Sequence, residues 1–118
     1  MDFAIILTTA SAAEEGWSIA NVLVEKQLAA CVNIIPKISS VYRWEGQIQS
    51  ETEVLLLIKT TKDLEAEVCR EVQNVHSYDT PELITLPITN GSETYLDWMT
   101  AAVHGSERLG FSVRCVKE

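Results

Sequence analysis

Val54-Leu55-Leu56-Leu57-Ile58 is an unbroken apolar run in the middle of the chain. Because neighbouring side chains of a strand point to opposite faces, such a run predicts a strand with apolar side chains on both faces of its sheet. Ile5-Ile6-Leu7, near the N-terminus, has the same character. We therefore expect these two segments to be the central strands of one sheet.

The apolar run belongs to the second arm of a long predicted hairpin. Residues 31–44 and 47–60 are rich in β-branched and aliphatic side chains, and Glu45-Gly46 between them is typical of a turn. Arms of about 14 residues span roughly 45 Å, whereas a compact chain of this size has a radius of gyration of about 13–14 Å. Pro36 cannot donate a ladder hydrogen bond, which predicts an edge strand or a bulge there. The hairpin therefore either bends at Pro36 or projects beyond its domain.

The remaining segments alternate between helical and strand-like patterns. Ser11 and Glu14 are spaced as a capping box for the first helix, and Ser92 is placed to cap the third. The order predicts an α+β protein with a ferredoxin-like β-α-β-β-α-β topology and an α-β tail. The predicted strands are 3–7, 82–88 and 111–116. The predicted helices are 12–29, a second from residue 61 or 62 to 75, and a third that follows the Ser92 cap and includes residues 95–103.

One face of this predicted sheet has no helix to cover it. Two helices in a core of about 100 residues can shelter only one face. The apolar run at 54–58 nevertheless supplies side chains to both faces. Oligomerisation, which would bury the open face and the projecting hairpin on neighbouring copies, is the favoured explanation. A hairpin bent over its own sheet is the alternative.

The composition is that of a globular protein, and we expect one domain over residues 1–118. Apolar residues make up 47% and charged residues 22%, while 17 acidic and 9 basic side chains give a net charge of −8. This charge argues against nucleic acid and anionic membranes and favours small cations. The odd number of widely spaced cysteines (31, 69 and 115) argues against a disulfide framework. With no signal sequence or membrane span, we expect a cytoplasmic protein.

Five short motifs resemble those of the CutA divalent-cation-tolerance family, in the same order. The resemblance implies a ferredoxin-like fold, a tightly interlocked homotrimer whose long hairpins pair between subunits, and an association with copper and other divalent metals. It also implies architectural kinship with the trimeric PII signalling proteins. The motifs are Ala29-Ala30-Cys31-Val32-Asn33-Ile34-Ile35-Pro36, Tyr42-Arg43-Trp44-Glu45-Gly46, Lys59-Thr60-Thr61, His76-Ser77-Tyr78-Asp79-Thr80-Pro81-Glu82-Leu83 and Tyr95-Leu96-x-Trp98.

The resemblance also points to metal ligands, from which this chain departs. Some members have a cysteine and a histidine where this chain has Thr8 and Val75, which leaves His76 as the candidate ligand. Cys31 is a weaker candidate, because its apolar setting is typical of a buried structural thiol. A transition metal usually needs three or four ligands, so His76 would require help from other copies. No cofactor is expected to be obligatory, although copper or another divalent cation could bind.

Eight aromatic and polar residues of these motifs form the other candidate site. Aromatic walls with a few charges are typical of a small-molecule pocket, and equally of a subunit interface. The interface is the favoured interpretation, with an intersubunit cleft serving both purposes as the alternative. Glu51 and Glu53 share one strand face, and we interpret them as solvated acids. The eight residues are Arg43, Trp44, Lys59, Tyr78, Thr80, Glu82, Tyr95 and Trp98.

These observations predict a homotrimeric CutA-like protein without enzymatic activity. Its expected role is weak binding of copper or another divalent cation in metal homeostasis, or service as a scaffold. The alternative is a PII-like signalling protein that binds a small metabolite at clefts between subunits. An enzyme using Glu82 or His76 as a general base is disfavoured, because the sequence shows no orienting partner.

Overall fold

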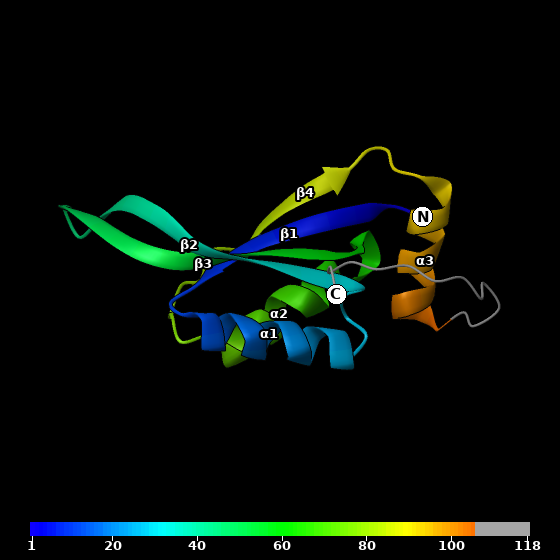
Figure 1. The fold of residues 1–118 in the computed structure, drawn as a ribbon, viewed down its shortest axis with the longest axis horizontal. Helices are drawn as coiled ribbons and strands as arrows, with labels where there is room; N and C mark the ends of the chain where they lie inside the picture. Colours follow the sequence, from blue (N-terminus) through cyan, green and yellow to red (C-terminus); the bar gives the residue numbers. More distant parts are fainter. Residues whose placement is uncertain (106–118) are drawn as a thin grey trace.

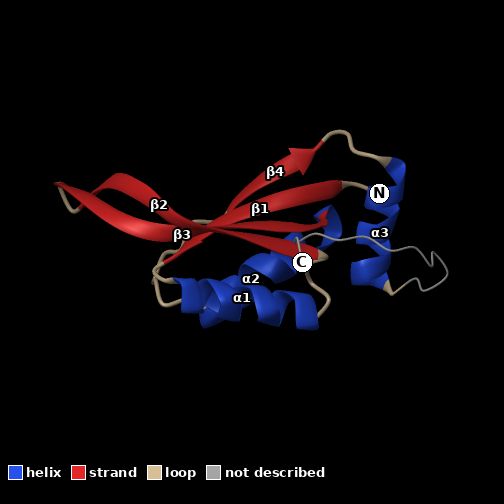
Figure 2. Cartoon of the chain, viewed as in Figure 1, coloured by secondary structure: helices blue, strands red, loops and turns tan. Residues whose placement is uncertain are grey.

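The computed structural model describes residues 1–105 and shows a four-stranded antiparallel sheet with two helices on one face and a third at one end (Figures 1 and 2). The strand order is β2-β3-β1-β4, so β1 and β3 are central, and the predicted ferredoxin-like topology is confirmed. The predicted strand at 111–116 lies outside the described residues. The strands are β1 (Phe3–Ala10), β2 (Cys31–Trp44), β3 (Gln47–Thr61) and β4 (Ile84–Ile88). The helices are α1 (Ala13–Glu25), the short 3-10 helix η1 (Lys62–Leu64), α2 (Glu65–Val75) and α3 (Glu93–His104).

The core lies between the sheet and helices α1 and α2. Alternate side chains of the central strands, among them Ile6, Leu56 and Ile58, have no exposed surface. They form one cluster with Leu23 of α1 and Val72 of α2. This packing follows from the strand period of two, because every second residue of β1 and β3 points toward the helices.

The opposite face of the sheet is apolar and only partly covered within residues 1–105. Leu57 of β3 lies opposite Leu7 of β1, which in turn lies opposite Ile84 of β4. Leu7 and Leu57 are half-buried, while Ile84 and Leu86 are 48% and 45% exposed. Helix α3 packs on Phe3 and Ile88 at one end of this face. The predicted uncovered face is therefore present within the part of the chain that the structure describes.

The β2–β3 hairpin projects from the body, as Figure 1 shows. Glu45 and Gly46 both have positive φ angles, 51° and 79°, which are the angles of a two-residue hairpin turn. β2 is an edge strand, and its pairing with β3 shifts register between Ile35 and Ile38, so Pro36 lies in a bulge. Residues 41–52 are all exposed, and the long axis of the molecule is 52 Å. Of the two alternatives, the hairpin projects rather than folding back on its own sheet.

Several predicted boundaries were wrong. Helix α1 ends at Glu25 instead of residue 29, because Gln27 has a φ of 57°, which reverses the chain. Ser11 does not form the predicted capping box with Glu14; its backbone N–H and its hydroxyl both donate to Glu15, four residues on. β1 extends to Ala10, and β4 begins at Ile84. The predicted cap of α3 is confirmed, since the Ser92 hydroxyl accepts a hydrogen bond from the Tyr95 N–H.

Candidate functional site

The loop between α2 and β4 is held to the body by His76. The ring Nε2 lies 2.6 Å from the Thr9 carbonyl oxygen, and Nδ1 lies 3.0 Å from the Tyr78 backbone nitrogen. Because an amide N–H can only donate, Nδ1 accepts, and the proton assigned to Nε2 is donated to Thr9. The side chain has no exposed surface. His76 therefore bridges the end of β1 and its own loop, with Glu15 Oε2 3.5 Å from Nδ1.

Glu15 of α1 holds the same loop from the other side. Its Oε2 accepts from the Ser77 N–H at 2.7 Å, and its Oε1 accepts from the Ser11 N–H and hydroxyl at 3.1 and 2.8 Å. Burial by itself would raise the pKa of this carboxyl group, but the hydrogen bonds from Ser11 and Ser77 outweigh burial and lower the pKa from 4.5 to about 2. The ionised carboxylate thus joins α1 to the loop after α2.

Glu15→Gln is expected to change how stability depends on pH. A carboxyl group whose pKa is lower in the folded state stabilises the fold above pH 4.5, and that stabilisation is lost as the pH falls toward 2. The variant is expected to lose on the order of 2 kcal/mol of unfolding free energy at pH 7 and to match the parent near pH 2. Denaturant unfolding between pH 2 and 7 measures this difference. Glu14→Gln, on the exposed side of the same helix, is the control; equal effects of the two variants would contradict the assignment.

Tyr78 connects this loop to the base of the hairpin. Its hydroxyl donates to Glu53 Oε2 on β3 at 2.7 Å, and its ring packs against His76 with centroids 4.7 Å apart. Burial raises the pKa of Tyr78, and the hydrogen bond to Glu53 and the nearby carboxylates of Glu53, Glu51 and Glu15 raise it further. Glu53 itself is only 7% exposed, so its interpretation as a solvated acid was wrong.

The eight predicted cluster residues occupy three separate places in one chain. Arg43 and Trp44 lie at the exposed hairpin tip, where Arg43 donates to the Gly46 carbonyl at 3.4 Å. At the other end of the sheet, the Lys59 Nζ lies 5.8 Å from the centre of the Tyr95 ring. Tyr95 and Trp98 of α3 are in tilted contact, with centroids 5.4 Å apart. The third place is the loop before β4, which carries Tyr78, Thr80 and Glu82.

These three places could form one pocket only if several copies contribute. The hairpin tip projects away from the body, and α3 stands at the opposite end of the sheet (Figure 1). No single chain therefore brings all eight residues around one ligand. This arrangement argues against a pocket within one subunit, and the interface and the intersubunit cleft both stay as predictions.

The predicted metal ligands are either buried or already hydrogen-bonded, which limits metal binding by one chain. Both ring nitrogens of His76 are engaged by backbone groups, so binding through His76 requires the loss of one of these hydrogen bonds. Thr8 is buried beside the core, and its hydroxyl has no hydrogen-bond partner in the described structure. Cys31 is buried opposite Lys59. Within residues 1–105, no group of three His, Cys, Asp or Glu side chains could hold a metal ion.

A second polar cluster, at the end of α3, resembles a catalytic relay only in composition. His104 Nε2 lies 3.2 Å from the Thr61 hydroxyl and 3.2 Å from Asp63 Oδ2. The hydrogen bond from Thr61, together with the nearby His104, lowers the pKa of Asp63. A hydroxyl–imidazole–carboxylate relay uses both ring nitrogens, whereas these two contacts share one. The cluster therefore ties α3 to the end of β3 and to η1, and has no relay geometry.

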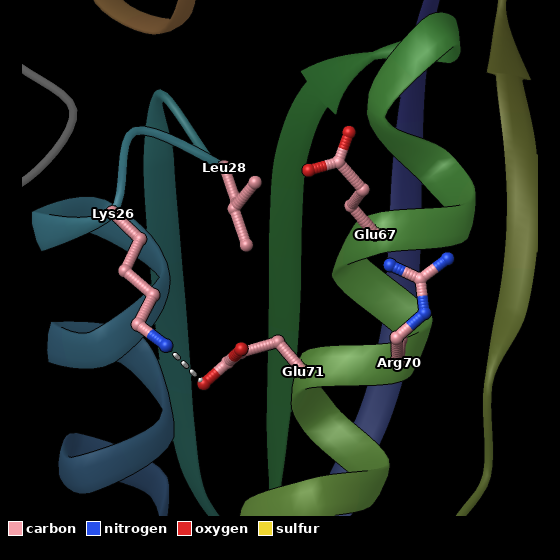
Figure 3. Close-up of a pocket in the computed structure, with 5 residues that line it drawn as sticks. All are labelled: Lys26, Leu28, Glu67, Arg70 and Glu71. Carbon is pink, nitrogen blue, oxygen red and sulfur yellow. Dashed lines mark hydrogen bonds and ion pairs between the residues drawn. The ribbon is translucent and has the colours of Figure 1, made fainter.

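A groove on the helical layer lies between the end of α1 and α2 (Figure 3). The Lys26 ammonium and the Glu71 carboxylate form an ion pair across it, at 2.9 Å. The lining carries charges of both signs, and it lies on the layer opposite the open sheet face. None of the predicted cluster residues contributes to it. The lining residues are Lys26, Leu28, Glu67, Arg70 and Glu71.

Sequence reasoning missed three members of the buried network around the 76–83 loop. Thr9 contributes only its carbonyl group, which no side-chain pattern can reveal. Glu15 was overlooked because Glu14 fits the capping-box spacing, and Glu53 because adjacent strand acids are commonly solvated. The sequence does contain a signal for the burial of Glu53. This residue alternates with Leu55 and Leu57, so its side chain points to the face of the sheet that no predicted helix covers.

Comparison with known proteins identifies the family. The model of the CutA1 divalent ion tolerance protein family matches residues 4–102. The chain belongs to this family. The divalent-cation tolerance protein CutA of Archaeoglobus fulgidus is 46% identical over 98 residues, which are 83% of this chain and 95% of that protein. Protein CutA, chloroplastic, of Arabidopsis thaliana is 48% identical over 95 residues, which are 80% of this chain and 52% of that protein, so the chain spans about half of its length.

Solved CutA structures agree with the fold. Crystalline CutA1 from Oryza sativa has a TM-score of 0.86 and 40% identity, with 90% of this chain and 97% of that chain covered. The structure of the periplasmic divalent cation tolerance protein CutA from Archaeoglobus fulgidus has a TM-score of 0.84 and 44% identity, with 86% and 98% covered. None of the helices in residues 1–105 combines the length and apolar character that a membrane crossing needs.

Proposed function

We propose that this CutA-family chain acts in divalent-cation tolerance as a cytoplasmic homotrimer without enzymatic activity. In this proposal the assembled protein binds copper or another divalent cation weakly, and the trimer serves metal homeostasis or a scaffolding role. Family membership supports the link to divalent cations. The open apolar face of the sheet is the structural observation on which assembly chiefly rests.

The open face exposes more contiguous apolar surface than is usual for a soluble monomer. Leu7, Leu57, Ile84 and Leu86 form a continuous surface across three strands. Contiguous exposed apolar patches on soluble proteins commonly mark interaction sites. The exposed hairpin tip adds Trp44, along with other large apolar side chains. Covering both surfaces with other copies removes this apolar area from water, which is the main driving force for association.

Cation binding in the proposal relies on more than one copy. Since no three-ligand group occurs within residues 1–105, a site built from these residues needs ligands from neighbouring subunits. His76 could join such a site only after one ring nitrogen releases its backbone partner. The free-energy cost of that release accords with weak binding. The net charge of −8 favours the approach of cations to the assembly.

The oligomeric mass and the response to copper test this proposal. Light scattering on purified protein is expected to give three times the chain mass of 13.1 kDa, and a monomer at micromolar concentration would overturn the proposal. Copper is expected to raise the melting temperature in a concentration-dependent way. His76→Ala and His76→Gln are expected to reduce this rise, while His104→Ala, the matched control, retains it. An unchanged rise in both His76 variants would exclude that residue as a ligand.

A further inference from the structure

The open face carries opposite charges at its two ends along β3. Leu55 and Leu57 occupy the middle of this side of the strand, with Glu53 before them and Lys59 after them. Because side chains alternate along a strand, all four point to the same side of the sheet. The apolar surface is therefore flanked by the buried Glu53 and the half-buried Lys59.

The neighbours of Lys59 are apolar and aromatic residues. Its neighbours across the ladder are Cys31 on β2 and Ile5 on β1, and its Nζ is 5.8 Å from the centre of the Tyr95 ring. None of the ion pairs formed within residues 1–105 involves Lys59. If another copy covers this face, the ammonium group loses water, and an unpaired buried charge is strongly unfavourable.

The other end of the face is negatively charged. Glu53 is 7% exposed and receives one hydrogen bond, from the Tyr78 hydroxyl, among the described residues. A carboxylate can accept about four, so a further donor can be accommodated. Glu51 and Glu15 add negative potential, since both raise the pKa of Tyr78 at this end. Neither Glu51 nor Glu53 takes part in an ion pair of the described structure.

We propose that Lys59 of one copy pairs with Glu53 of the next copy across the open face. This inference rests on the proposed homotrimer. Within one chain the two residues are six positions apart on a strand, or about 20 Å, too far for direct contact. Between copies, a surface with a cation at one end and an anion at the other is complementary to itself when it is arranged head to tail. Head-to-tail contacts close into a ring when the rotation between copies permits.

The pairing also explains how two buried charges are tolerated on an apolar interface. A buried ion pair is acceptable only when both members find partners, and removal of one member leaves the other unpaired. Lys59 and Glu53 would then fix the relative position of the copies, while Leu55, Leu57 and Leu7 supply the apolar contact. Electrostatic complementarity of this kind sets the register and partner choice at interfaces.

A double-mutant cycle on the full chain tests the pairing. Lys59→Met removes the cation, Glu53→Gln removes the anion while keeping an acceptor for Tyr78, and the third variant combines the two. Each single variant is expected to weaken subunit association by roughly tenfold or more. The double variant is expected to associate no more weakly than the more weakly associating of the two single variants. Sedimentation over a dilution series measures association, and circular dichroism confirms folding. Arg70→Met, which removes a cation from the exposed surface of α2, is the control.

The outcomes separate the pairing from the assembly itself. Because the two residues are too far apart to interact within one chain, non-additive effects identify a contact between copies. Additive effects, or single variants that associate like the parent, would overturn the pairing while leaving the homotrimer in place. A monomeric parent protein would overturn both. Lys59→Arg keeps the positive charge and is expected to associate within about threefold of the parent, so a loss as large as that of Lys59→Met would also refute the pairing.

Discussion

Leu57→Asp is expected to convert the assembled protein into folded monomers. Leu57 lies in the middle of the open face, opposite Leu7 on β1 and Asn33 on β2. A carboxylate here would have to be buried without a partner when a second copy covers the face, at a cost of several kcal/mol per interface. The fold of the single chain is expected to persist, because Leu57 is not part of the cluster under α1 and α2.

Light scattering together with circular dichroism measures this result. The expected observation is a mass near 13.1 kDa with unchanged helix and strand content. Asn21→Asp, which adds the same charge to an exposed position of α1, is the control and is expected to remain assembled. An assembled Leu57→Asp variant would show that the open face is not the contact surface.

Leu56→Ala is expected to have the largest effect on the stability of the subunit itself. Leu56 is next to Leu57 in the sequence but points to the helical face, where it has no exposed surface. A Cβ atom at Gly16 of α1 would lie only 3.6 Å from its side chain, which shows how closely the helix packs on it. Truncation leaves a cavity beneath α1 and is expected to lower the unfolding free energy by about 3 kcal/mol.

Denaturant unfolding at fixed protein concentration measures this loss. Leu57→Ala is the matched control, since it removes the same atoms from the other face; its effect is expected to be smaller and to depend on protein concentration. A loss below about 1 kcal/mol for Leu56→Ala would contradict the placement of Leu56 in a closely packed core.

The architecture could be predicted from local patterns. Unbroken apolar runs such as 54–58 predict central strands, and spacing of three and four predicts the helices that cover one face. The uncovered face could also be predicted from the sequence, because two helices cover only one side of a sheet. Boundaries were less predictable. The end of α1 depends on the left-handed conformation of Gln27, a residue type for which that conformation is uncommon.

The candidate site was only partly predictable, because its contacts join distant parts of the chain. His76 was singled out as a possible ligand, yet its ring bonds to the Thr9 carbonyl group, 67 residues away in the sequence. Tyr78 was placed in the aromatic and polar cluster, but its hydroxyl partner is Glu53, 25 residues away. Only the folded chain shows which of these polar groups meet.

By itself, the amino-acid sequence determined the order of elements, the central strands and the existence of an apolar face without cover. These properties depend on the period of side chains along each strand or helix, which is local. The tertiary structure decided that the hairpin projects, that Glu53 is buried, and that His76 is held by backbone groups. Those outcomes depend on which distant segments come together, and burial and hydrogen bonding of a polar side chain are settled only by that packing.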